Sequence, residues 1–238
     1  ALALAKSSDV VIMVLGEHGM QSGEGRSRAN LSLPGVQQQL LEAVYKVNKN
    51  IVLVLHNGRP LAIDWADQNI PSILEVWQLG SQSGNAIAQV LFGDYNPSGK
   101  LTMTFPRSLG QVPIYYNHRT TGRPLEEDQK YTSKYLDVPN TPLYPFGYGL
   151  SYSSFDTELK GISQEGNFIH IDVDVTNTST VDGSEIVQLY YRDVLCSYTR
   201  PVKQLCRFLK VDLKQGEKRN IRFDIYTQEL GFFDNQGN

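Results

Sequence analysis

The sequence predicts an α/β domain followed by an all-β domain. Up to about residue 93, short apolar runs alternate with segments whose apolar residues recur at helical spacing, as in a parallel sheet with helices on its faces. From Phe155 onward, apolar and polar residues alternate in short strands separated by turn residues, which is typical of an antiparallel β-sandwich. We predict a mostly parallel α/β sandwich in residues 1–115, a connecting segment in 116–154 and a β-sandwich in 155–238.

Three strands and two helices are expected in the α/β part. The strands are predicted at 9–15, 50–56 and 72–80, and the helices at 35–48 and 83–93. Continuous apolar runs such as "DVVIMVL" predict strands that are covered on both faces. The opening "ALALAKSSD" has the pattern of a helix end without a preceding strand. We therefore expect an α/β sandwich that is incomplete at its N-terminus, and a chain that is a fragment.

The stretch from Asp94 to Tyr152, which includes most of the connecting segment, is rich in proline, glycine and tyrosine, and little regular structure is expected in it. Its tyrosines suit either stacking on sugars or packing of a linker against two domains. Beyond it, strands are predicted at 168–178, 184–194, 202–213 and 218–227. The first of these places Ile171, Val173 and Val175 on one face. Since the chain stops where further strands would close the sheets, we expect this sandwich to be truncated.

Composition excludes several classes of function. The formal net charge is -3 and no run of lysine or arginine interrupts it, so nucleic acid is not expected as a partner. No apolar stretch approaches the ~20 residues of a membrane span, and the first residues lack the pattern of a signal peptide. Two cysteines, Cys196 and Cys206, suit neither a disulfide scaffold nor a zinc site.

The loop after the first strand, "LGEHGMQSGEGRSRANLSLPG" (15–35), carries the candidate functional residues. In open α/β sheets, ligands bind at the carboxyl ends of strands, and this loop begins at such an end. Its glycines give the backbone freedom to bring a carboxylate inward. Ser32 is expected to cap the next helix, with Pro34 in the first turn. The charged residues of the loop are Glu17, His18, Glu24, Arg26 and Arg28.

Three other chemistries fit this loop less well. The glycine spacing does not match a phosphate-binding fingerprint, and two glutamates would repel a phosphate. Glu17 and His18 are adjacent in sequence and point apart, and no second histidine is near, so no metal site is predicted. A Ser-His-Asp triad is compatible with the composition, but no nucleophile elbow is present. Carboxylate chemistry remains.

Five motifs now carry a specific resemblance. They are "GEHGMQSGEGRSRANLSLPGVQQQLLEAV", "VLVLHNGRPLAI", "LFGDYNPSGKLTMTFPRS", "PLYPFGYGLSY" and "TRPVKQL". In this order they resemble the second and third domains of glycoside hydrolase family 3 β-glucosidases, particularly the bacterial periplasmic type. The resemblance covers almost the whole chain. It implies a three-domain enzyme, in which a barrel carries the nucleophilic aspartate, an α/β sandwich supplies the general acid/base, and a fibronectin type III-like β-sandwich follows.

By this resemblance the acid/base is Glu24, four residues before Arg28. Glu17 is the runner-up, and its expected role is structural, through hydrogen bonds to loop amides. The bland alternative for Glu24 is a solvated acid that pairs with Arg26 or Arg28. His18 is a candidate pocket residue. Tyr131, in "QKYTSKYLD" (129–137), is a candidate for the pocket wall, while an interdomain strap explains that segment equally well.

Two further points concern the electrostatics of the site. A general acid needs a raised pKa, whereas a neighbouring arginine lowers the pKa of a carboxyl group. Arg28 is therefore expected to face away from the reacting oxygen, or to bind the substrate or Glu17. Asp64, in "AIDWADQ", superficially resembles the family's nucleophile motif but lies in the wrong domain. We expect Asp64 to be a surface or helix-start acid.

The sequence thus predicts part of a retaining, exo-acting β-glucosidase, inactive alone because the nucleophile belongs to an absent N-terminal barrel. A β-xylosidase of the same family, or a module that binds carbohydrate or protein without catalysis, are the alternatives. The expected partners are a β-glucoside or oligosaccharide and the barrel of the same polypeptide, and a homodimer is a candidate assembly. No cofactor or metal is required. The resemblance suggests a periplasmic or secreted location.

Overall fold

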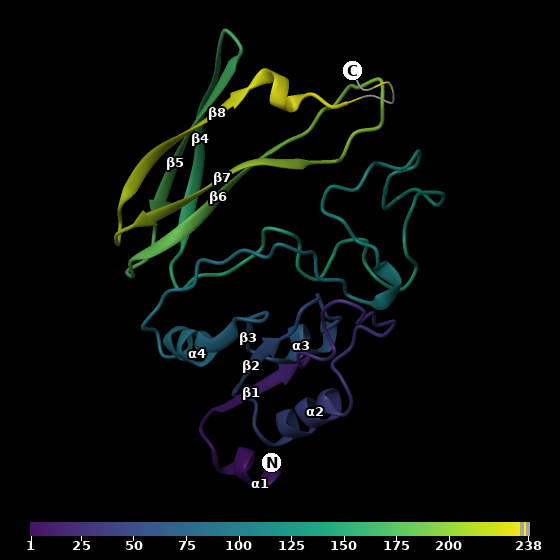
Figure 1. Ribbon diagram of the computed structural model, residues 1–238, viewed down its shortest axis with the longest axis vertical. Coiled ribbons are helices and arrows are strands. Elements are labelled where there is room, and N and C mark those ends of the chain that lie inside the picture. Colours follow the sequence, from purple (N-terminus) through teal and green to yellow (C-terminus); the bar gives the residue numbers. More distant parts are fainter. Residues whose placement is uncertain (234–235, 237–238) are drawn as a thin grey trace. The chain divides into compact units, whose positions relative to one another are not determined.

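The computed structural model describes residues 1–233 and 236 (Figure 1). These residues form two compact units, which are described separately. The first unit comprises residues 1–92, 101–148 and 193–202, and the second comprises 93–100, 149–192 and 203–238. The first contains a parallel sheet with helices and the second contains antiparallel strands, which confirms the predicted order of α/β followed by all-β.

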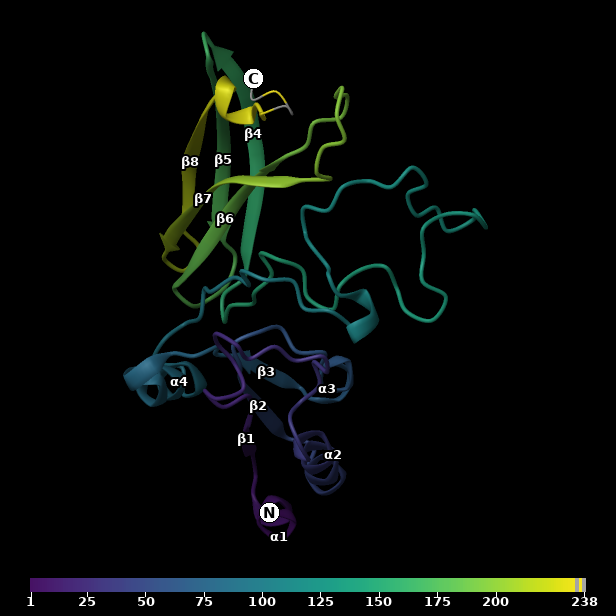
Figure 2. The same cartoon turned by 45° about the vertical axis from the view of Figure 1, so that its right-hand side comes forward.

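The first unit is built on a three-stranded parallel sheet in the order β1-β2-β3. The strands are β1 (Val11–Gly16), β2 (Ile51–His56) and β3 (Ser72–Glu75). The helices are α1 (Leu2–Ser7), α2 (Gln37–Val47), α3 (Asp64–Asn69) and α4 (Ser83–Leu91). In Figures 1 and 2, α2 and α3 lie on one side of the sheet and α4 on the other. The predicted strands and helices are therefore confirmed, and α3 is an addition.

The main core cluster of this unit lies on one face of the sheet, while Val54 of β2, which points to the other face, is also fully buried, so β2 is covered on both faces as expected. Leu53 and Leu55 of β2 are fully buried in the main cluster together with Leu41 of α2. The expectation that the first strand is covered on both faces is wrong, because Ile12 is 47% exposed and Val14 is 61% exposed. β1 is an edge strand of this sheet, and the side chains of Ile12 and Val14 are open to solvent on the face opposite the core.

Two predicted boundaries shift for local reasons. The helix expected from residue 35 begins at Gln37, its N-cap is Val36, and Ser32 does not cap it. The backbone of Ser32 is used elsewhere, since its N–H donates to Asn30 Oδ1 and its carbonyl accepts from Arg28. The third strand ends at Glu75, five residues before the predicted end. There the chain turns at Trp77, which has a φ of +48°.

The second unit contains five strands in two antiparallel sheets. They are β4 (Phe155–Glu165), β5 (Phe168–Asn177), β6 (Gly183–Tyr191), β7 (Gln204–Leu213) and β8 (Lys218–Tyr226). One sheet has the order β4-β5-β8 and the other is β6-β7. The alternating residues Ile171, Val173 and Val175 are buried in a core with apolar side chains of β6, β7 and β8. The predicted pattern of this strand is confirmed.

The segment between residues 94 and 152 has little regular structure, as predicted. Its described elements are a short 3-10 turn at Leu109–Gln111, a bridge between Phe105 and Tyr144, and a bridge from Arg119 to Pro201. Phe105 is 1% exposed and packs into the core of the first unit. Across the described residues, no helix combines the length and the apolar character that crossing a bilayer would need.

Candidate active site

The candidate site begins at the carboxyl end of β1, where the chain must leave the sheet abruptly. Gly16 has a φ of +128°, and a Cβ atom there would lie 2.0 Å from the carbonyl oxygen of His56. Only glycine fits this position without a shift of backbone. The Gln37 side chain then clamps Gly16 from α2. Gln37 Oε1 accepts from the Gly16 N–H at 2.7 Å, and Gln37 Nε2 donates to the Gly16 carbonyl at 2.9 Å.

We expect Gln37→Ala to destabilise the first unit by about 1–2 kcal/mol, because two partly buried backbone groups lose their partner. The two tryptophans of the chain, Trp65 and Trp77, both lie in this unit, so their fluorescence during urea unfolding reports on it alone. Gln39→Ala, at an exposed position on the same helix, is the control and is expected to change the free energy of unfolding by less than about 0.5 kcal/mol. Equal effects of the two substitutions would contradict the clamp.

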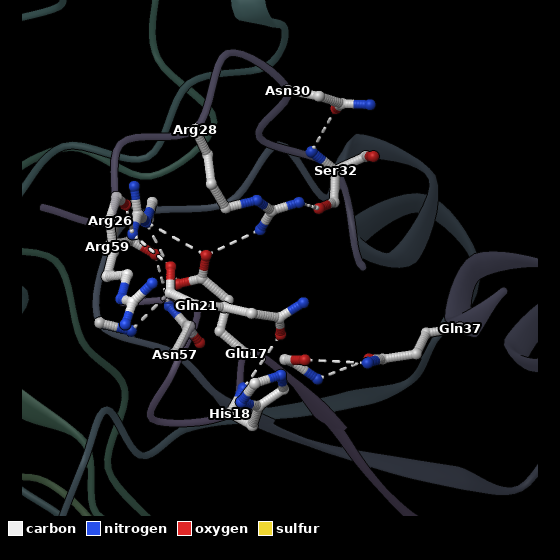
Figure 3. Close-up of polar contacts among 12 residues, drawn as sticks. Glu17, His18, Gln21, Arg26, Arg28, Asn30, Ser32, Gln37, Asn57 and Arg59 are labelled. Atoms are coloured by element: carbon white, nitrogen blue, oxygen red, sulfur yellow. Dashed lines mark hydrogen bonds and ion pairs between the residues drawn. The ribbon is translucent and has the colours of Figure 1, made fainter. Parts of the chain in front are cut away.

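Directly after Gly16, the Glu17 side chain turns into the protein and is completely buried. Its carboxylate accepts from Arg28 Nη1 at 2.7 Å and from Arg59 Nε at 3.1 Å. The Gly58 N–H approaches the second oxygen at 3.4 Å. Figure 3 shows the carboxylate between the two guanidinium groups. A buried carboxylate with these partners is a structural anchor, and Arg28 adopts one of its expected positions by binding Glu17.

Arg59 also holds the backbone of the loop that follows Glu17. Its Nη2 donates to the carbonyl oxygens of Gln21 and Arg26, each at 2.7 Å. Gly58 packs closely against the same loop, because a Cβ atom on Gly58 would lie only 1.9 Å from Ser22 Oγ. The turn after β2 therefore supports residues 17–28, and Figure 3 shows Arg59 beside Gln21 and Arg26 of that loop. In the sequence these two residues lie before and after Glu24.

Glu24 lies at the tip of this loop. It is the second residue of a turn that the Arg26 N–H closes on the Gly23 carbonyl at 3.1 Å. Gly25 has a φ of +68°, as the third position of a type II turn requires. Glu24 is exposed, and among the described residues no arginine or lysine forms an ion pair with it. The loop thus presents a carboxyl group that no described lysine or arginine neutralises.

The other candidate residues are placed as follows. His18 is exposed, and its Nδ1 accepts from the Met20 N–H at 3.1 Å within the same loop. Tyr131 is 73% exposed, and its ring faces the ammonium group of Lys130 at 5.4 Å. Over residues 1–233 and 236, Tyr131 takes no part in the hydrogen bonds of the Glu17 loop. Asp64 is the first residue of α3, which confirms its expected place at a helix start.

The end of β3 adds a carboxyl group that the sequence did not reveal as part of this region. Glu75 Oε1 accepts from the Trp77 N–H at 2.9 Å. Burial raises the pKa of Glu75 to about 8. The hydrogen bond from Trp77 has a smaller effect and lowers this pKa. The Asn57 side chain, fully buried directly after β2, acts in the same direction as Trp77 and lowers the pKa of this carboxyl group.

Sequence reasoning missed Arg59, Asn57 and Glu75. The signal for Arg59 was available in "VLVLHNGRPLAI", because the carboxyl ends of parallel strands meet at one edge of a sheet. Arg59, which follows β2, is therefore expected to lie beside Glu17, which follows β1. Glu75 was less visible, since "SILEVWQLG" resembles a continuous apolar run in which one acid suggests an exposed position.

Comparisons with known proteins agree with this architecture. Residues 1–152 match the glycosyl hydrolase family 3 C-terminal domain, and residues 185–238 match the fibronectin type III-like domain. The periplasmic beta-glucosidase of Salmonella typhimurium is 48% identical over 99% of this chain and 32% of its own length. A beta-xylosidase of Formosa agariphila is 44% identical over 98% of this chain and 32% of its own length.

The solved structures give the same answer. The beta-glucosidase from Listeria innocua, in complex with isofagomine, matches 99% of this chain and 34% of its own chain with a TM-score of 0.95 and 40% sequence identity. This chain spans about a third of the length of the curated relatives it matches. Because the family match covers more than half of its residues, and the motifs and the fold agree with it, the chain belongs to glycosyl hydrolase family 3.

Proposed function

We propose that this chain supplies the general acid/base of a retaining, exo-acting β-glucosidase and that Glu24 is that residue. The observation that carries the proposal is the presentation of Glu24 at the tip of an anchored loop, exposed and without a cationic partner among the described residues. Family membership and the names of the relatives support the reaction class. The nucleophilic aspartate would come from a barrel domain of the same polypeptide, as the resemblance implies.

The reaction would proceed in two steps. In the first, the aspartate attacks the anomeric carbon while the Glu24 carboxylic acid gives its proton to the glycosidic oxygen. The bond between that oxygen and the anomeric carbon breaks, the aglycone leaves as an alcohol, and a covalent glycosyl-enzyme remains. In the second, the Glu24 carboxylate takes a proton from water as that water attacks the anomeric carbon and releases the sugar. No metal or organic cofactor enters either step.

The pairing of Arg28 supports this role for Glu24. A general acid must hold its proton until the leaving group needs it, and an adjacent arginine would favour the ionised form. In this chain the Arg28 guanidinium is committed to Glu17 at 2.7 Å and to the Ser32 carbonyl at 3.1 Å. The charge of Arg28 therefore stabilises Glu17, where the loop leaves the sheet, and forms no ion pair with Glu24.

The proposal is tested by joining the chain to the part of the Salmonella relative that this chain does not match, which the family resemblance implies contains the barrel; we call this protein the barrel fusion. We expect the fusion to hydrolyse an aryl β-glucoside and the 238-residue chain alone to be inactive, because a retaining mechanism needs two carboxyl groups. The complete Salmonella enzyme is the positive control. Hydrolysis by the chain alone would mean that the nucleophile lies within these 238 residues, and Asp64 would be the first candidate. A folded fusion that binds glucose without hydrolysis would favour a binding module.

The same fusion separates the two candidate substrates. The relatives include both a beta-glucosidase and a beta-xylosidase, so an aryl β-xyloside belongs in the same assay. We propose β-glucosidase activity because the relative of higher identity bears that name. Its name also supports a periplasmic or secreted location for this chain.

A further inference from the structure

Three arginines belong to the loop after β1 and to the turn that supports it, and they differ in what their guanidinium groups bind. Arg28 and Arg59 both donate to the buried carboxylate of Glu17, at 2.7 Å and 3.1 Å. Arg26 is exposed, and over residues 1–233 and 236 its guanidinium forms no hydrogen bond or ion pair. One of the three positive charges is therefore free to bind a group from outside the chain.

The backbone of Arg26 is fixed, although its side chain is free. Its N–H closes the turn on the Gly23 carbonyl at 3.1 Å, and its own carbonyl accepts from Arg59 Nη2 at 2.7 Å. Binding to a group on a fixed backbone costs less ordering of the loop than binding to a group on a mobile one. The guanidinium can therefore recognise a ligand from a defined point of attachment.

Arg26 and Glu24 belong to the same turn. They are two positions apart, so their Cα atoms lie within ~7 Å of each other. No ion pair joins the two side chains in the described part of the chain. An arginine side chain is long enough to span this separation, so a molecule that touches the Glu24 carboxyl group lies within reach of the Arg26 guanidinium.

The charges of this region leave an excess of positive charge. The three arginines face two glutamates, so the excess is one charge when both glutamates are ionised and the histidines are neutral. It rises to two when Glu24 carries the proton that it gives in the first step. Glu75 does not offset it, because burial raises the pKa of Glu75 to about 8 and keeps this carboxyl group mostly protonated at neutral pH. The balance favours a ligand with one negative charge.

A general acid lies on the side of the leaving group. The two carboxyl groups of a retaining glycosidase flank the scissile bond, and the acid is the one that contacts the departing oxygen. Since Arg26 shares a turn with Glu24, its guanidinium is placed beside the aglycone. This step rests on the proposed function of Glu24, whereas the free guanidinium and the charge balance do not.

We propose that Arg26 is a specificity-determining residue that binds a carboxylate on the aglycone, and that the substrate class is therefore β-glucosides with a carboxylate-bearing leaving group. A guanidinium can give two parallel N–H···O bonds to one carboxylate, which fixes its orientation as well as its charge. The aglycone carboxylate takes no part in the bond changes. The proton still passes from Glu24 to the glycosidic oxygen, and the aglycone leaves as an alcohol with its carboxylate ionised.

The first test uses the barrel fusion and two substrates of similar shape, 4-carboxyphenyl and 4-carbamoylphenyl β-glucoside, which differ by one negative charge. The ratio of kcat/KM for the first to kcat/KM for the second is measured in the parent and in Arg26→Gln, so the difference in leaving-group ability cancels. We expect the substitution to lower this ratio by about ten- to a hundredfold. Lys6→Gln, which removes an exposed positive charge of α1, is the control and is expected to leave the ratio unchanged.

Two further variants separate charge from shape. Arg26→Lys keeps the charge but loses the fork of donors, so it is expected to retain part of the preference. Arg26→Glu is expected to lower the ratio below that of Arg26→Gln, because like charges repel. Sodium chloride should lower the ratio of the parent toward that of Arg26→Gln, because salt screens exposed charges. The urea midpoint of each variant should equal that of the parent, since this side chain is exposed.

Arg26 is expected to act on only one of the two chemical steps. The aglycone departs in the first step, so it is absent when water attacks the glycosyl-enzyme. Arg26→Gln should therefore lower kcat/KM for the carboxylate substrate. It should leave kcat unchanged, at the pH optimum, for an activated aryl β-glucoside whose turnover is limited by the second step. A merely structural disturbance of the loop would lower both constants.

Two results would overturn the inference. One is a ratio that Arg26→Gln leaves unchanged, which would make Arg26 a solvated surface residue. The other is an equal fall of kcat/KM for both substrates together with a lower kcat, which would give Arg26 a structural role. Either result can occur while Glu24→Ala abolishes hydrolysis, and then the proposed function stands without this inference. If Glu24→Ala left hydrolysis by the fusion intact, the proposed function itself would fail.

Discussion

Replacing Glu24 by alanine in the barrel fusion is expected to lower kcat/KM for an aryl β-glucoside with a poor leaving group by about 10²–10⁴-fold. The poor leaving group cannot depart without a proton, and no described side chain replaces the carboxyl group at the tip of the loop. With an activated leaving group the first step needs no acid, so the glycosyl-enzyme should accumulate. Azide should then restore turnover and yield the β-glucosyl azide, because it attacks without a general base.

The controls isolate the chemistry from the fold. Asp9→Asn replaces an exposed carboxylate at the amino end of β1, the opposite end of the strand from the loop, and is expected to leave kcat/KM unchanged. Glu24→Ala itself should unfold at the same urea concentration as the parent, since the side chain is exposed. Full hydrolysis by Glu24→Ala, or loss without rescue by azide, would remove Glu24 from the mechanism.

Replacing Glu17 by alanine is expected to destabilise the first unit by about 3 kcal/mol. The substitution leaves Arg28 and Arg59 largely buried, with exposed side-chain fractions of 19% and 21%, and without their carboxylate. Breaking one side of a buried ion pair is costly because the remaining charge loses its compensation. The measurement is the free energy of unfolding from urea titration, followed by the fluorescence of Trp65 and Trp77.

A double-mutant cycle identifies the source of that loss. If the cost arises from the stranded cation, Arg59→Met should lower the stability less in the Glu17→Ala background than in the parent, with a coupling free energy of about 1–3 kcal/mol. The Arg107 and Asp64 pair of the same unit is the comparison, because it is longer, at 3.8 Å, and more exposed, and exposed pairs contribute about 0–1 kcal/mol. Additive effects of Glu17→Ala and Arg59→Met would show that the coupling free energy between the two residues is close to zero.

The parts of the fold that depend on local patterns were predictable. Period-two alternation identified β5 and its buried face, and helical spacing identified α2 and α4 to within a few residues. The loop after β1 was recognisable because a buried strand ends in glycine and acid. Family resemblance then added the role of Glu24, which remains a prediction, as do the domain boundaries drawn from the sequence.

What the sequence concealed depends on contacts between distant segments. Arg59 meets Glu17 across 42 positions, and the pairing follows only from the parallel register in which Gly16 lies beside His56. The exposure of Ile12 and Val14 was hidden because an apolar run looks the same whether one or both faces are covered. The early end of β3 depends on a left-handed tryptophan, a conformation that residue identity rarely predicts.

The division of the loop into a fixed base and a free tip has a consequence for how the sequence can vary. Glu17, Gly58 and Arg59 are constrained by buried charge and by close packing, so substitutions there act on folding. Between the anchored residues Glu17 and Gln21, an added Cβ on Gly19 would meet nothing within 4 Å, and His18 and Met20 are exposed. Evolution or a designed library can therefore diversify residues 18–20 of the same loop with little penalty in expression, and a search for new selectivity should begin there.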